Sequence, residues 1–157
     1  RTPWHFDDHH FPLDTNDVVT AWVPAQPTPL EMGPLSFAYP LNVHKLVNAV
    51  TFEKTGTGYD RGVSDIFSKN NVSVNETPFE LGEVSFHHNL NFHTASSNRT
   101  NRSRIALANT YYRDGARVVN SPTMVSGDWQ KFMPNVKPGD VAASPLNPIC
   151  WPVKDKS

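Results

Sequence analysis

Three side chains in this sequence are of the types that bind a metal ion, and their spacing brings two of them together. His5 and Asp7 are separated by one residue, so on a strand both side chains leave the same face and can reach one ion. His93 is the best candidate for a third ligand, because it ends a second segment with strand character. Two histidines and one carboxylate on one face of an octahedral ion leave positions open for other ligands, as in non-haem iron(II) oxygenases. A closed tetrahedral zinc site leaves no such room.

Arg104 has the donor geometry for a carboxylate. Its planar guanidinium offers paired N–H groups that match a carboxylate in bidentate contact. It follows His93 after a turn, and this hairpin-like connection would place it deeper than the metal. Ala106 and Ala108 share its face on the predicted strand, and these small side chains would leave space for a bound molecule. We therefore expect Arg104 to bind a carboxylate-bearing co-substrate.

The elements that must position these residues are short. The sequence contains 14 prolines and 8 glycines scattered along the chain, and short segments between turn residues favour a β-rich fold. Residues 41–81 are expected to form a long excursion over the mouth of a barrel, where substrate selection usually lies. From residue 115 on, we expect mostly loops. Strands are expected at residues 17–23, 35–39, 84–93 and 104–112, and a short helix at residues 44–50.

The segment of residues 84–93 alternates regularly between apolar and polar side chains. Val84, Phe86 and Phe92 fall on one face, whereas His87 and His93 fall on the other. On one continuous strand, His87 and His93 would lie roughly 20 Å apart at the usual rise per residue. His87 is therefore not expected to reach the ion that His93 binds.

Length and composition limit the class of protein. With 157 residues, the chain has room for a single domain with one core. A hydrophobic fraction of 38% and a charged fraction of 18% are typical of a globular domain. The formal net charge is −1 and no Lys/Arg-rich run occurs, which argues against nucleic acid or an anionic membrane as the main partner.

The hydropathy and the cysteine content bear on membrane association and on the compartment. No apolar stretch approaches the length of a membrane span. The single cysteine, Cys150, cannot form an internal disulfide. This fits a reducing compartment, so we expect a cytoplasmic protein.

Four blocks of sequence in the right order resemble the phytanoyl-CoA dioxygenase (PhyH-like) family. They are residues 2–7, 19–23, 31–35 and 82–107. The resemblance implies an all-β, double-stranded β-helix (jelly-roll, cupin-like) core with a short helix and long loops. It also implies that residues 1–157 form one catalytic core, with residues 41–81 as its lid. Because the sequence enters the first block at Thr2, we expect the core to lack its N-terminal portion.

The resemblance also assigns roles. It implies that His5, Asp7 and His93 bind Fe(II), that Arg104 binds 2-oxoglutarate, and that O₂ is the oxidant. The implied reaction is hydroxylation of an aliphatic C–H bond of a small-molecule substrate. The family often has a serine where this chain has Ala95. Further candidate contacts to the co-substrate are Ser96, next to that position, and Thr20. Asp7 disfavours a halogenase, which needs that ligand position vacated for halide.

Two alternatives use the same fold differently. A cupin-like hydrolase or isomerase would bind the metal without 2-oxoglutarate, and Arg104 would then be dispensable. A non-catalytic jelly-roll binding module, or a fragment unable to hold iron, would take up no metal.

Overall fold

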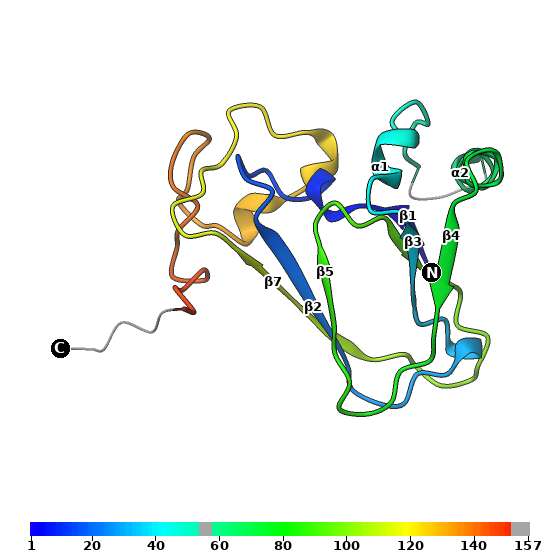
Figure 1. Ribbon diagram of the computed structural model, residues 1–157. Coiled ribbons are helices and arrows are strands. Elements are labelled where there is room, and N and C mark those ends of the chain that lie inside the picture. Colours follow the sequence, from blue (N-terminus) through cyan, green and yellow to red (C-terminus); the bar gives the residue numbers. More distant parts are fainter. Residues whose placement is uncertain (54–57, 152–157) are drawn as a thin grey trace. The chain divides into compact units, whose positions relative to one another are not determined.

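The computed structural model describes residues 1–53 and 58–151 (Figure 1). The chain divides into two compact units. The first unit comprises residues 1–7 and 19–110, and the second comprises residues 8–18 and 111–157. That the two form a single catalytic core remains a prediction.

A four-stranded sheet in the first unit carries two of the candidate ligands. Its strand order is β1-β6-β3-β4, and each neighbouring pair is antiparallel. The register places His93 opposite both His5 and Phe37. Directly opposite residues share a face of a sheet, so the fold itself brings the two imidazoles together. The strands are β1 (Thr2–His5), β6 (His93–Ala95), β3 (Leu35–Tyr39) and β4 (Ser73–Glu76).

A three-stranded sheet, with the order β5-β2-β7, is labelled in Figure 1. The antiparallel pair of β5 and β2 places Thr20 directly opposite His87. The expected strand at residues 17–23 is confirmed with a shift of one residue, and that at residues 104–112 begins later, at Ala106. The strands are β5 (Ser85–His88), β2 (Val18–Pro24) and β7 (Ala106–Tyr112).

The expected single strand at residues 84–93 is wrong. Strand β5 ends at His88, the amide of Asn91 donates to the carbonyl of His88 at 2.9 Å, and β6 begins only at His93. The two strands lie in different sheets. The chain therefore passes from the three-stranded sheet to the four-stranded sheet between His88 and His93. The alternation of side chains between two faces does not continue from β5 into β6.

Residues 41–81 are more ordered than the sequence indicated. They contain α1 (Val43–Leu46), α2 (Gly58–Lys69) and β4, whereas we expected one helix at residues 44–50. Residues 54–57 of this excursion lie outside the described residues. Helix α2 buries Tyr59 and Val63 in the core of the first unit. The other buried members of this core are Phe6, Ala38, Val43, Val47 and Phe92.

The second unit has a core of its own among loops. Trp129 and Val118 are buried in it, and the hydroxyl of Tyr112 donates to the carbonyl of Ala142 at 2.7 Å. The expectation of a loop-rich C-terminal part is confirmed. Among the described residues, no helix is long and apolar enough to span a membrane. Four short 3-10 helices complete the described structure, η1 (Asp7–His9), η2 (Leu30–Met32), η3 (Met124–Ser126) and η4 (Trp129–Lys131).

Candidate metal centre

His5, Asp7 and His93 converge on one point. Their ligand atoms all lie within 4.8 Å of one another. Asp7 Oδ1 is 3.5 Å from His5 Nε2 and 3.7 Å from His93 Nε2. Donors bound cis on an octahedral ion, with bonds of about 2.1 Å, lie roughly 3 Å apart. The three side chains therefore fit a metal with a small inward adjustment.

The local structure around Asp7 differs from the expected strand. Strand β1 ends at His5, and Asp7 lies in the 3-10 helix η1. Because the chain bends at this point, the carboxylate turns back toward the imidazole that the strand presents. The two side chains lie close together as expected, but in a geometry that is not that of a strand.

Backbone carbonyls fix which nitrogen of each histidine faces the site. His5 Nδ1 is 2.9 Å from the carbonyl oxygen of Pro3, and His93 Nδ1 is 2.9 Å from that of Asn91. A carbonyl can only accept, so each Nδ1 carries a proton, and Nε2 is the nitrogen of each ring that is left to face a metal. This is the arrangement that holds metal-binding histidines in orientation.

The charges of the site suit a cation. Burial alone would raise the pKa of Asp7, but the imidazoles of His5 and His87 outweigh it and hold the pKa well below its usual range. Burial lowers the pKa of His93 to about 3. At neutral pH the carboxylate is therefore ionised and His93 is neutral, which are the protonation states that a metal requires.

Thr20, a candidate contact for the co-substrate, lies against Asp7. Its hydroxyl donates to Asp7 Oδ2 at 3.0 Å and is 3.1 Å from the hydroxyl of Thr110. In this position Thr20 supports a metal ligand. Its contact to a co-substrate stays a prediction.

The expectation that His87 lies far from the site is wrong. Its ring centroid is 4.6 Å from that of His93, and its Nε2 is 3.5 Å from Asp7 Oδ2. The distance of roughly 20 Å assumed one straight strand. Because β5 and β6 belong to different sheets, both histidines reach the same carboxylate from different strands.

Arg104 lies beside the turn formed by residues 32–33. Its Nη1 donates to the carbonyls of Met32 and Ser96, each at 3.2 Å, and to that of Gly33. These bonds fix the guanidinium through one of its nitrogens. All three bonds involve Nη1. In the part of the chain that the structure describes, Nη2 and Nε donate to no acceptor, so they are available to a carboxylate.

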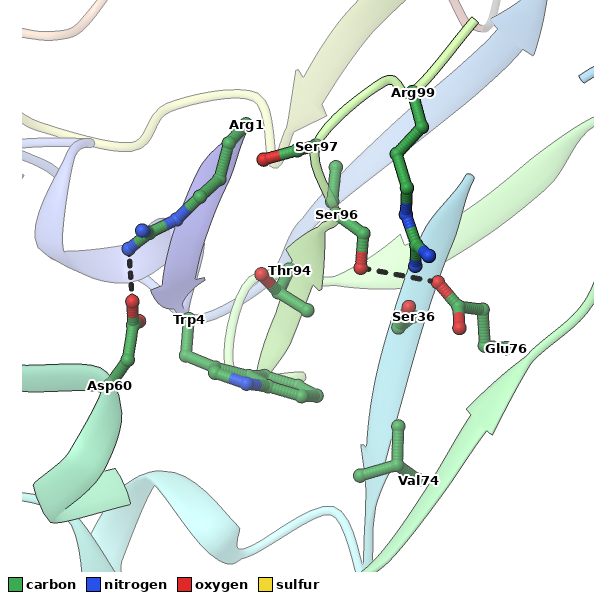
Figure 2. A pocket seen from close by; sticks show the side chains of 11 residues that line it. Arg1, Trp4, Ser36, Asp60, Val74, Glu76, Thr94, Ser96, Ser97 and Arg99 are labelled. Carbon is green, nitrogen blue, oxygen red and sulfur yellow. Dashed lines mark hydrogen bonds and ion pairs between the residues drawn. The ribbon is translucent and has the colours of Figure 1, made fainter. Parts of the chain in front are cut away.

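The hydroxyl of Ser96, the other candidate contact for the co-substrate, is not brought to the three ligands. It is 3.4 Å from Glu76 Oε1, and it lines a pocket together with Trp4 and Thr94 (Figure 2). Along β6, Thr94 alternates with His93 and Ala95, so the pocket lies on the face of the sheet away from the ligand His93. The carbonyl of Ser96, rather than its hydroxyl, contacts Arg104.

A side chain added at Gly33 tests whether this turn positions Arg104. Its φ is +73°, and a methyl group here would overlap the Ser96 carbonyl and lie 3.0 Å from Nη1 of Arg104. We expect Gly33→Ala to lose more than the roughly 1–2 kcal/mol that a left-handed φ costs a side chain. Urea unfolding measures this loss. We also expect weaker 2-oxoglutarate binding, because Arg104 must shift.

Gly82→Ala is the matched control for this prediction. Gly82 has a φ of +95°, and an added methyl group would meet no atom within 4 Å. It therefore carries the backbone strain without the overlap. Equal losses of stability in the two variants, with unchanged 2-oxoglutarate binding in both, would contradict the proposed coupling of Gly33 to Arg104.

The family model described as phytanoyl-CoA dioxygenase (PhyH) matches residues 1–106, which include the three ligands and Arg104. The chain belongs to the phytanoyl-CoA dioxygenase family. No curated protein matched the sequence.

Solved structures of similar fold are non-haem enzymes that use α-ketoglutarate (2-oxoglutarate). The carbocyclase SnoK from nogalamycin biosynthesis is 24% identical, with a TM-score of 0.67 over 92% of this chain and 53% of its own. The epimerase SnoN from the same biosynthesis is 22% identical, with a TM-score of 0.61 over 94% of this chain and 51% of its own. This chain thus spans about half the length of these structures.

A second structure of SnoN, in complex with Fe³⁺, α-ketoglutarate and nogalamycin RO, is 27% identical to this chain. Its TM-score is 0.55 over 74% of this chain and 44% of its own. These likenesses, with the two sheets and few helices, confirm the expected double-stranded β-helix fold. Iron and 2-oxoglutarate, the cofactors expected from the sequence, are the groups that this relative holds.

Proposed function

We propose that this chain is the catalytic core of a non-haem iron(II), 2-oxoglutarate-dependent dioxygenase that hydroxylates an aliphatic C–H bond of a small organic substrate. The observation that carries the proposal is the convergence of His5, Asp7 and His93, with both Nε2 atoms within 3.7 Å of one carboxylate oxygen. Membership of the phytanoyl-CoA dioxygenase family supports it independently.

The chain's own residues position the reactants. His5, Asp7 and His93 would hold the ion and would leave its remaining coordination positions for the co-substrate and O₂. Arg104 would bind the far carboxylate of 2-oxoglutarate through Nη2 and Nε, since Nη1 is already bonded to the backbone. Bound iron supplies, with 2-oxoglutarate and O₂, the oxidising power that no side chain has.

The candidate ligand His93 is shielded from solvent. His93 is 4% exposed, and the ring of Phe37 lies 6.0 Å from its ring. A dry site strengthens the interactions of the ion with its ligands and protects reactive species. We further propose residues 41–81 as the region that selects the substrate, as the sequence predicted.

The proposal is tested by adding Fe(II) and 2-oxoglutarate to the chain without oxygen. We expect the weak visible charge-transfer band of the iron chelate, and we expect a chelator to remove it. A folded chain that binds metal without the band would favour the cupin-like hydrolase or isomerase. A folded chain that binds no metal would favour the non-catalytic module.

Hydroxylation needs a test separate from the test for formation of the iron chelate, because SnoK and SnoN are named for other reactions, carbocyclisation and epimerisation. With oxygen and a candidate substrate, a hydroxylated product is heavier by one oxygen atom. A product of unchanged oxygen content would retain the iron and 2-oxoglutarate chemistry and contradict the hydroxylase part of the proposal.

A further inference from the structure

We infer that His87 is a positioning residue that keeps Asp7 bound to the metal through one oxygen only. The inference rests on the proposed function, since it concerns the same iron site. The two oxygens of Asp7 have different neighbours. Oδ1 faces the two ligand histidines, at 3.5 and 3.7 Å. Oδ2 faces the hydroxyl of Thr20 at 3.0 Å and Nε2 of His87 at 3.5 Å.

The fold supplies both neighbours of Oδ2 from one sheet. Thr20 on β2 and His87 on β5 are directly opposite each other, so their side chains share a face. The ligands His5 and His93 come instead from the four-stranded sheet. Within the described residues, the group whose ligand atoms all lie within 4.8 Å of one another is His5, Asp7 and His93, without His87. His87 therefore acts on the carboxylate and not on the metal.

Holding Oδ2 has a chemical consequence at the ion. A carboxylate that can rotate binds a metal through both oxygens and takes a further coordination position. The proposed function needs three open positions, two for 2-oxoglutarate and one for O₂. With Oδ2 held by Thr20 and His87, Asp7 offers Oδ1 alone and these positions stay open.

The buried environment of His87 favours this role over a purely stabilising one. The residue is 4% exposed, and its Nδ1 has no hydrogen-bond partner in the described structure. When Nε2–H donates to Asp7, Nδ1 is left as a buried acceptor, which is unfavourable for folding. An apolar side chain of similar size would avoid this penalty. The advantage of a histidine at this position is its donor to Oδ2.

Two variants separate hydrogen bonding from packing. His87→Leu removes the donor and keeps most of the bulk, whereas His87→Gln keeps an N–H donor. His88→Ala, an exposed neighbour on β5, is the control. We use Co(II) alone as the probe and follow its visible absorption. We expect His87→Leu to bind Co(II) about 10- to 100-fold more weakly, in the range of outer-shell substitutions. We expect His87→Gln to recover most of the affinity and His88→Ala to match the unaltered chain.

A second measurement reports the binding mode of Asp7 directly. Infrared spectra of Co(II)-loaded protein with ¹³C-labelled aspartate give the separation of the two carboxylate stretching bands. This separation is wide for a one-oxygen ligand and narrow for a two-oxygen ligand. We expect the narrow separation in His87→Leu and the wide one in the unaltered chain and in His87→Gln. A merely structural role of His87 would not change this separation.

Each outcome decides the inference. Unaltered Co(II) affinity and band separation in His87→Leu overturn it, and so does a folded His87→Gln that behaves like His87→Leu. If these variants match an unaltered chain that binds Co(II) and 2-oxoglutarate, the proposed function stands and only the role of His87 falls. If the unaltered chain binds neither, both fall.

Discussion

His93→Ala is expected to bind iron(II) more than roughly 100-fold more weakly than the unaltered chain, because even substitutions outside the ligand set cost up to that factor. His93 is one of the three proposed ligands, and its Nε2 is oriented by the bond from Nδ1 to the Asn91 carbonyl. Two remaining ligands cannot hold the ion against water. The charge-transfer band with 2-oxoglutarate and all 2-oxoglutarate-dependent turnover should disappear together.

The measurement is a Co(II) or Fe(II) titration under anaerobic conditions, with circular dichroism as the check of folding. His93 is buried, so the variant also loses packing and must be shown to be folded at the assay temperature. His88→Ala removes an exposed imidazole from the same part of the sequence and should bind metal normally. A folded His93→Ala that still gives the band would remove His93 from the ligand set.

The convergence of the three candidate ligands was predictable because it depends on residue type and order more than on exact backbone geometry. His5 and Asp7 were expected on one strand, yet Asp7 lies in η1. The prediction that His5 and Asp7 lie close together still holds, because the side chains of two residues so close in sequence can meet in several backbone conformations. His93 was predicted from its place at the end of a polar face, and the register of β1 with β6 confirms its proximity to His5.

The position of His87 was missed because periodicity cannot show where a chain changes sheet. Apart from His88, apolar and polar residues alternate in the sequence of residues 84–93 on both sides of the turn that separates β5 from β6. Asn89 and Asn91, residues typical of turns, were the signal that the strand ends. Once the segment is divided there, His87 and His93 become neighbours in space.

The content of residues 41–81 was missed for two different reasons. Helix α2 has a helical pattern, with Tyr59, Val63 and Phe67 at intervals of four residues, but polar side chains around them hid it. Strand β4 has no pattern to find, because all four of its residues are exposed and it pairs with a single strand, β3. An edge strand of this kind is defined by its partner and not by its own residues.

Arg104→Met is expected to weaken 2-oxoglutarate binding by more than roughly 100-fold while iron(II) binding stays nearly unchanged. Two charge-assisted hydrogen bonds, each worth about 1.5–3 kcal/mol, would be lost with the fork of donors. Arg104→Lys should recover little of this, since an ammonium cannot make the paired contact. The dissociation constant of 2-oxoglutarate, read from the charge-transfer band, is the measurement.

Arg104 also bonds to the carbonyls of Met32, Gly33 and Ser96, so its loss affects stability as well as binding. The two effects are separable, because a destabilised but folded chain still presents its three metal ligands. Metal affinity therefore serves as the internal reference, and Arg102→Met, at an exposed arginine in the preceding turn, is the external one. If Arg104→Met keeps both its iron and its 2-oxoglutarate affinity, the co-substrate carboxylate is held elsewhere. If it loses both in proportion, Arg104 supports the fold of the site and does not bind 2-oxoglutarate.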